Sequence, residues 1–139
     1  MCLYINRNKH RISLFDKRRF KAIKLREDKW VWKELVYYNG VWTTPYMGKV
    51  IRFNPAGVYV LPAFSKEVFE DSVEYDYYYN YLGTGSTVGR KGAYGYHAYT
   101  TEKASLGGRH LFKAKIPKGS YAYYGDDDIC ANQMIIYED

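Results

Sequence analysis

Cysteine, histidine and long apolar runs are scarce in this chain of 139 residues. Two cysteines, Cys2 and Cys130, are too few for a disulfide framework. The three histidines stand at no spacing typical of metal ligands. No apolar run reaches the length of a membrane span, and the basic start lacks the apolar core of a secretory signal. We therefore expect a cytoplasmic protein with reduced thiols, without a bound metal and without a membrane partner.

The common motifs of catalysis and cofactor binding are also missing. The glycines between positions 83 and 92 lack both the Gly-Lys-Ser/Thr of a phosphate-binding loop and the helix and acid of a dinucleotide-binding motif. No serine stands in a Gly-x-Ser-x-Gly turn. Cys130 follows the acidic run Asp126–Asp128, which is predicted to form an exposed turn and whose charge disfavours a reactive thiolate. The sequence thus predicts no cofactor and contains no complete catalytic constellation.

Tyrosine and basic residues, in contrast, are abundant. Seventeen tyrosines favour a β-rich fold with half-exposed sheet surfaces, and tyrosine is also common at interfaces. Within the net charge of +6, residues 1–33 hold eleven Lys or Arg against three acids, whereas residues 120–139 hold five acids and no base. The basic beginning suits a polyanion, but an ordinary solvated surface explains it as well, and both interpretations stay open.

The first half of the chain carries clear signals for strands and one helix. Aromatic and β-branched runs over 30–38 and 41–46 flank Asn39-Gly40, the pair best suited to a two-residue type I′ hairpin turn. Strands over 49–53 and 57–61 flank a second predicted turn, and Ser65 can cap a short helix. That helix is expected to run from Lys66 to about Val73, with an apolar stripe of Val68, Phe69 and Val73.

The second half predicts a strand up to residue 99, a short helix and three more strands. Thr100 or Thr101 can cap the helix, and Gly107-Gly108 can end it. Alternation predicts a strand over 111–116, and a turn at 117–119 leads into another strand over 120–124. In the last strand, over 133–137, two adjacent isoleucines predict that both faces are covered.

Between these halves, residues 75–91 form a predicted Tyr- and Gly-rich loop. Its amides could converge on an anion, with Arg90 and Lys91 adding positive charge, and we expect it to become ordered when such a ligand binds. A flexible insertion without a ligand is the alternative. The expected fold class is α+β: a single domain over residues 1–139, built on a mostly antiparallel, twisted β-sheet with two short helices.

Several motifs stand out along the chain. They are Met1-Cys2-Leu3, Gly95-Tyr96-His97-Ala98-Tyr99 followed by Ala104, Ile116-Pro117-Lys118-Gly119-Ser120 with Tyr123 and Gly125, and upstream Lys33, Leu35 and Pro45. Together they resemble a family of small uncharacterised proteins from bacteria and their phages. The resemblance covers most of the chain outside residues 75–91. It implies a phage or mobile-element origin, for which counter-defence is an expected role, and it attaches no activity.

The predicted layout combines a hairpin with Lys-x-Leu, a Gly-aromatic run before a short helix, and a strand that ends in Pro-x-Gly. This layout is similar to that of ADP-ribosyltransferase domains. Those domains use a late glutamate to support attack on the nicotinamide ribose. Here the strand before Pro117 carries Lys113 and Lys115 where an acid is wanted, so the similarity implies a related fold that has lost the chemistry.

Basic and aromatic residues alternate through the region after residue 89, and cations suit phosphates while flat rings suit bases. The candidate ligand-binding residues are Arg90, Lys91, Tyr96, His97, Tyr99, Arg109, Lys113, Lys115 and Lys118. The same mixture also fits an ordinary wet β-surface.

We therefore expect a non-enzymatic binding protein, located in the host cytoplasm if a phage encodes it. Its partner would be an anionic ligand, either a nucleotide signal or a nucleic acid, or a host protein that it masks, and a homo-oligomer is possible. The alternative is a divergent ADP-ribosyltransferase-like or nucleotide-hydrolysing enzyme with His97, Tyr99 and Glu102 as its catalytic residues. Against this stands the interpretation of His97 as a packed structural residue.

Overall fold

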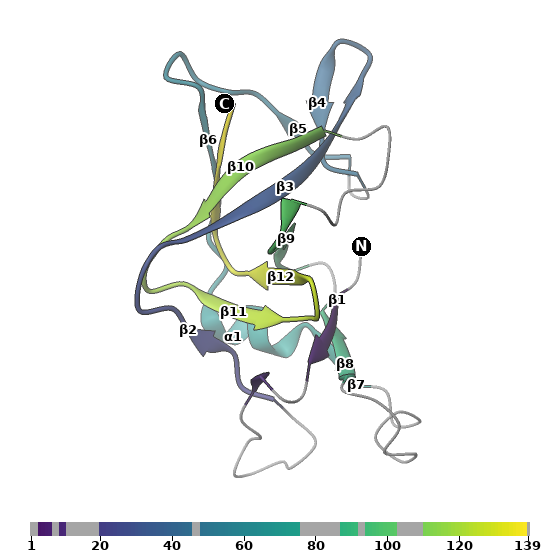
Figure 1. The fold of residues 1–139 in the computed structure, drawn as a ribbon, viewed down its shortest axis with the longest axis vertical. Coiled ribbons are helices and arrows are strands. Elements are labelled where there is room, and N and C mark those ends of the chain that lie inside the picture. Colours follow the sequence, from purple (N-terminus) through teal and green to yellow (C-terminus); the bar gives the residue numbers. More distant parts are fainter. Residues whose placement is uncertain are drawn as a thin grey trace.

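The computed structural model describes residues 3–6, 9–10, 20–45, 48–75, 87–91, 94–102 and 110–138. In these ranges the chain forms a single, mostly antiparallel β-sheet domain with one short helix, as Figure 1 shows. The elements are β1 (Leu3–Asn6), β2 (Ile23–Lys24), β3 (Lys29–Tyr38), β4 (Val41–Thr43), β5 (Val50–Ile51), β6 (Val58–Leu61), α1 (Lys66–Asp71), β7 (Val73–Tyr75), β8 (Thr87–Lys91), β9 (Tyr96–Tyr99), β10 (His110–Ile116), β11 (Tyr121–Tyr124), β12 (Asp128–Ala131) and β13 (Met134–Tyr137).

The β-rich class is therefore confirmed. The second predicted helix, after Thr100 or Thr101, falls on residues 103–109, outside the described residues. Of the residues described, none belongs to a helix with the length and apolar character that a membrane span requires.

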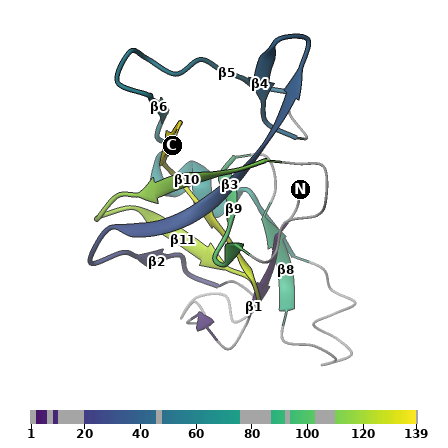
Figure 2. The same cartoon turned by 45° about the horizontal axis from the view of Figure 1, so that its top comes forward.

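Strand β3 organises the larger of two sheets. That sheet follows the order β2-β11-β12-β9-β3-β10-β13-β6, with β4 and β5 extending from β3, while β1, β8 and β7 form the smaller sheet. Strand β3 pairs with β10 over seven positions, from Lys29–Ile116 to Leu35–His110. Its other edge meets β9 at a single position, Trp32–Tyr99. Figure 2 shows β3 and β10 side by side above β11.

The two faces of the larger sheet are covered differently. One face holds the main core, to which β3 contributes Val31 and Leu35 and β10 contributes Ala114 and Ile116. The opposite face of β11 and β12 is covered by a second cluster, which includes residues of β1, α1 and β7. Its buried members are Leu3, Ile5, Phe20, Phe69, Val73, Tyr123 and Cys130. Within the described residues, this second cluster contains no side chain of β10, β13 or β6, so it does not cover the same face of those strands.

The predicted type I′ hairpin is confirmed. Asn39 and Gly40 have φ values of 49° and 82°, and this turn needs positive φ at both positions. The register places Tyr38 opposite Val41 and Val36 opposite Thr43, as the two-residue turn dictates.

The next turn and the helix start are also confirmed. The Oδ1 atom of Asn54 accepts the backbone N–H groups of Ala56 and Val58, each at 3.0 Å. The Oγ atom of Ser65 accepts the N–H of Val68 at 3.2 Å, which caps α1. The helix ends at Asp71, earlier than predicted, because β7 begins at Val73.

Three local predictions were wrong. Val68 is 45% exposed, so the buried stripe of α1 reduces to Phe69. Residues 87–91, placed in the loop, form β8 between β1 and β7, because the β-propensity of this segment is realised only with distant partners. Asp128, placed in an exposed acidic turn, begins β12 opposite Tyr99. The rest of the loop that was expected to become ordered, residues 76–86, lies outside the described residues.

The final strand also differs from its prediction. Both faces of β13 were expected to be covered, because Ile135 and Ile136 are adjacent. Met134 and Ile136 are fully buried, whereas Ile135 and Tyr137 keep part of their surface exposed. Strand β13 therefore has one core face and one face toward solvent.

The beginning of the chain is fastened to the β11–β12 turn. Asn6 Nδ2 donates to Asp126 Oδ1 at 3.0 Å, and Lys9 Nζ donates to the carbonyl of Gly125 at 3.0 Å. His10 Nε2 accepts the N–H of Tyr124 at 2.8 Å, which leaves Nδ1 to donate to the carbonyl of Lys21 at 3.1 Å. Burial lowers the pKa of His10, in agreement with this neutral imidazole. Residues 11–19, which follow this contact, lie outside the described residues.

Candidate functional site

Four neighbouring strands present an uncovered surface on the side away from the main core. On β3, Val31 points into the core, so Trp30 and Trp32 point outward, and β6, β10 and β13 alternate in the same way. We call this surface the open face. It consists of Trp30, Trp32, Val58, Val60, Lys113, Lys115, Ile135 and Tyr137.

Exposure of large apolar groups sets the open face apart from a normal sheet surface. Trp30 is 45% exposed and Val60 is 63% exposed. Lys113 is exposed, and Lys115 is partly so. Scattered apolar side chains on a surface need no explanation, but a contiguous patch with cations beside it is typical of a binding surface.

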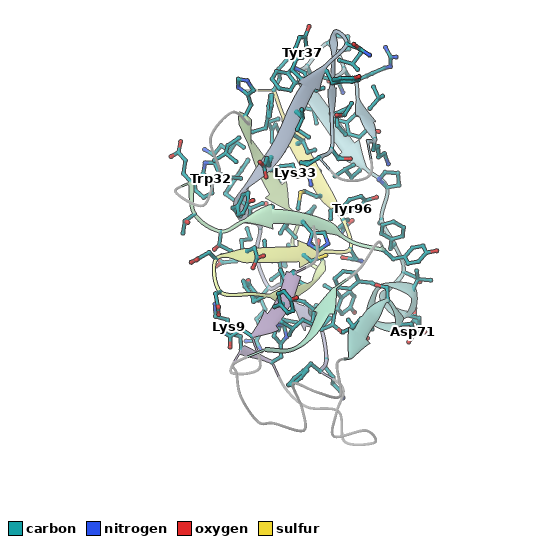
Figure 3. The ribbon with its side chains drawn as sticks, turned by 90° about the vertical axis from the view of Figure 1, so that its right-hand side faces the viewer. Lys9, Trp32, Lys33, Tyr37, Asp71 and Tyr96 are labelled. Carbon is teal, nitrogen blue, oxygen red and sulfur yellow. The ribbon has the colours of Figure 1, made fainter. Side chains whose placement is uncertain are left out.

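The register arranges aromatic and cationic residues in pairs. Lys115 lies opposite Trp30, and Lys113 lies opposite Trp32. Because both pairs are on one face, the strand pair repeats an aromatic-plus-cation unit every two residues, or about 6.8 Å. Figure 3 shows Trp32 and Lys33 on opposite sides of β3, as this alternation requires.

Trp30 is the centre of the open face. The ammonium of Lys113 lies 5.1 Å from the centroid of its ring, and that of Lys115 lies 5.8 Å from it. The ring of Tyr137 is 5.4 Å from that of Trp30, and Lys115 also lies 6.0 Å from the Tyr137 centroid. Within the described part of the chain, neither ammonium is ion-paired with a carboxylate. Two cations and two rings thus share one small exposed area.

Lys118, another predicted ligand residue, lies at the corner that follows β10. Its backbone N–H donates to Asp28 Oδ1 at 2.8 Å, and Gly119 completes the turn with a φ of 88°. This bond fastens the corner to the segment that leads into β3. Lys29 follows Asp28, and its ammonium lies 5.7 Å from the ring of Tyr124.

His97 and Tyr99 belong to a buried polar group along β9. His97 Nε2 is 3.6 Å from Cys130 Sγ, and the cysteine has no exposed surface. The hydroxyl of Tyr99 donates to Glu34 Oε2 at 3.1 Å, and both residues are buried. A buried thiol has little access to a substrate, so this arrangement is that of a packed polar interior.

Lys33 is the unusual member of this buried group. It points to the core side of β3, and its ammonium donates to the carbonyl of His97 at 2.8 Å. Burial lowers the pKa of its ammonium to about 8, although the charges of Cys130 and Glu34 act in the opposite direction and raise it. Strands β3 and β9 pair at one position only, and Lys33 bridges them beside that position.

The remaining candidates are spread over the molecule. Tyr96 packs against the main core, and its hydroxyl donates to the carbonyl of Pro62. Glu102 is exposed beyond the end of β9. Arg90 and Lys91 belong to β8, opposite Tyr4 and Leu3 of β1. Arg109 lies outside the described residues.

Of the candidates that the structure describes, the open face therefore unites only Lys113 and Lys115. Sequence reasoning missed Trp30, Trp32 and Tyr137. The sequence does contain one signal, because Trp30 and Trp32 alternate with Val31 along β3 and therefore share one side of the strand. Lys33 and Glu34 place a charged residue on each side, so the sequence does not tell which side faces the core. Among the described residues, no group of three or more His, Cys, Asp or Glu side chains could hold a metal ion.

Comparison with known proteins adds no relative. No family model, no curated protein and no solved structure matches this chain.

Proposed function

We propose that this chain is a non-enzymatic binding protein whose open face engages a ligand that carries both flat rings and negative charge, a nucleotide or a nucleic acid. The observation that carries the proposal is Trp30, a large exposed ring with two ammonium groups within 6 Å. Aromatic side chains stack bases, and lysines contact phosphates.

The lysines are free to change partners. A cation–π contact at an exposed site is worth about 0.5–1 kcal/mol, so moving Lys113 or Lys115 from the ring to a phosphate costs little. Stacking of a base on the ring released in this way contributes about 1–3 kcal/mol. The net charge of +6 adds long-range attraction for a polyanion.

The test measures binding of fluorescent nucleotides and oligonucleotides by anisotropy at low and high salt. We expect Trp30→Ala to lower affinity at every salt concentration, and Lys113→Ala to lower it mainly at low salt. Tyr38→Ala is the matched aromatic control, because Tyr38 is 65% exposed at the hairpin and away from the open face. Lys24→Ala is the matched charge control, because Lys24 is exposed on β2. Equal losses in Lys24→Ala and Lys113→Ala would reduce the interaction to general charge attraction.

The enzymatic alternative centred on His97 has one observation in its favour, the 3.6 Å approach of its Nε2 atom to Cys130 Sγ. Chromatography of nucleotides after incubation with the protein decides between the two. Turnover that disappears in a folded His97→Ala variant would establish an enzyme. Intact nucleotides, together with a lowered melting temperature for that variant, would assign His97 to the interior.

A further inference from the structure

Three aromatic side chains lie close together on the open face, which gives it more than one place for a base. Trp32 and Trp30 follow one another on the same side of β3, where successive Cα positions of one face are about 6.8 Å apart. The register places Tyr137 of β13 in the same row as Lys113 and Trp32, and its ring reaches to 5.4 Å from that of Trp30. A mononucleotide has one base and would occupy one of these rings.

The spacing suits bases that are separated from one another. Stacked bases in a nucleic-acid strand are about 3.4 Å apart along the axis. Two aromatic residues whose Cα atoms are about 6.8 Å apart on one face of a strand suit bases that have been unstacked, each lying on its own side chain. Lys115 opposite Trp30 and Lys113 opposite Trp32 then offer one cation for each base position.

From this repeat we infer that the open face binds a single-stranded nucleic acid, with about three consecutive nucleotides lying along Trp32, Trp30 and Tyr137. The inference rests on the proposed function and specifies its ligand. A duplex is excluded by the same geometry, because its bases are stacked and paired and cannot reach the rings. The rings accept any base, so the face is tolerant of sequence.

Oligonucleotide length provides the decisive measurement. Competition against a labelled hexamer is measured with dT1, dT2, dT3, dT4 and dT6, with the equivalent rU series, and with a duplex of equal length. We expect affinity to rise steeply with length up to about three nucleotides. Beyond that length it should rise only slightly, because a longer oligonucleotide can occupy the same site in several alternative positions. Each stacking platform is expected to contribute about 5- to 150-fold. We expect the duplex to bind at least tenfold more weakly than the single strand.

Variants separate the platforms. Trp32→Ala is expected to weaken dT3 or longer by about 5- to 150-fold and to change the affinity for dT1 and dT2 little, because Trp30 and Tyr137 remain, whereas Trp32→Phe keeps most of the affinity. The length series uses the unaltered protein, so it decides the matter even where a tryptophan variant is unstable.

The outcomes distinguish this inference from the proposed function. If dT1 binds as tightly as dT6, or if the duplex binds as tightly as the single strand, the single-strand inference is overturned while ligand binding at the open face stands. If no nucleotide or oligonucleotide binds at low salt, both fail.

Discussion

Lys33 makes the stability of this protein depend on pH in a way that one substitution should remove. Its ammonium is enclosed in the core and donates to the carbonyl of His97 at 2.8 Å. Burial lowers its pKa from 10.5 to about 8. The folded state therefore releases this proton more readily than the unfolded state, and stability rises with pH between about 8 and 10.5.

The magnitude follows from the two pKa values. The contribution of Lys33 is fully present above 10.5 and is lost as pH falls through about 8. Between pH 7 and pH 9.5 the difference in proton binding corresponds to about 2 kcal/mol of unfolding free energy. Lys33→Met keeps an unbranched side chain of similar length and removes the titration.

The assay is urea unfolding of the wild type and Lys33→Met at pH 7 and at pH 9.5. The wild type should gain about 2 kcal/mol relative to the variant between these two pH values. Subtracting the two proteins at each pH cancels other titrating groups, including the seventeen tyrosines. Lys113→Met serves as the matched surface control, since Lys113 is exposed on β10. A constant difference between wild type and Lys33→Met would refute a lowered pKa in the folded state.

Three further predictions concern other parts of the fold. Burial, followed by the charges of its acidic neighbours, raises the pKa of Asp128 to about 6, so its contribution to stability is present below about 3.8 and is lost as pH rises through about 6. The unfolding free energy of Asp128→Asn should therefore rise by about 1 kcal/mol relative to that of the wild type when the pH is raised from 5 to 8 in urea unfolding, a value that allows for the partial exposure of the side chain. A fall relative to the wild type over this pH range would contradict the prediction. Tyr99→Phe should cost about 1.5–3 kcal/mol, because a buried Glu34 oxygen loses its hydroxyl donor, and an unchanged melting temperature would show that the bond is unimportant. Asn54→Ala removes two side-chain hydrogen bonds of the turn before β6 and should cost about 1–2 kcal/mol by thermal unfolding, with Asn54→Asp as the variant that retains them.

Local signals were the part of the fold that the sequence could reveal. Asn39-Gly40 defines its hairpin, and Ser65 begins α1, because a turn or a cap depends on residues within a few positions. The pairing of β3 with β10 joins position 29 to position 116, and no short window of sequence contains both strands. Segments such as β8 form only because distant partners supply their hydrogen bonds.

The open face escaped prediction for a related reason. Strand β3 has apolar residues on both sides, with Trp30 and Trp32 outward and Val31 and Leu35 inward, and it places Lys33 among the inward residues. Its polarity therefore does not identify the core side. Only the partner strands decide it, since Ala114 and Ile116 of β10 are buried and Lys113 and Lys115 are not.

The fastening of the first residues to the β11–β12 turn constrains how the chain reaches its native state. The hydrogen bond between His10 and Tyr124 joins residues 114 positions apart, so it can form only after Tyr124 has been synthesised. Strand β3 likewise emerges from the ribosome long before β10 does. Chains dominated by such distant pairings fold slowly, on the order of milliseconds to seconds, because loop closure precedes the gain from contact. During synthesis the tryptophan-bearing strand therefore stays unpaired along its β10 edge until β10 has been made, and an unpaired strand edge of this kind favours aggregation.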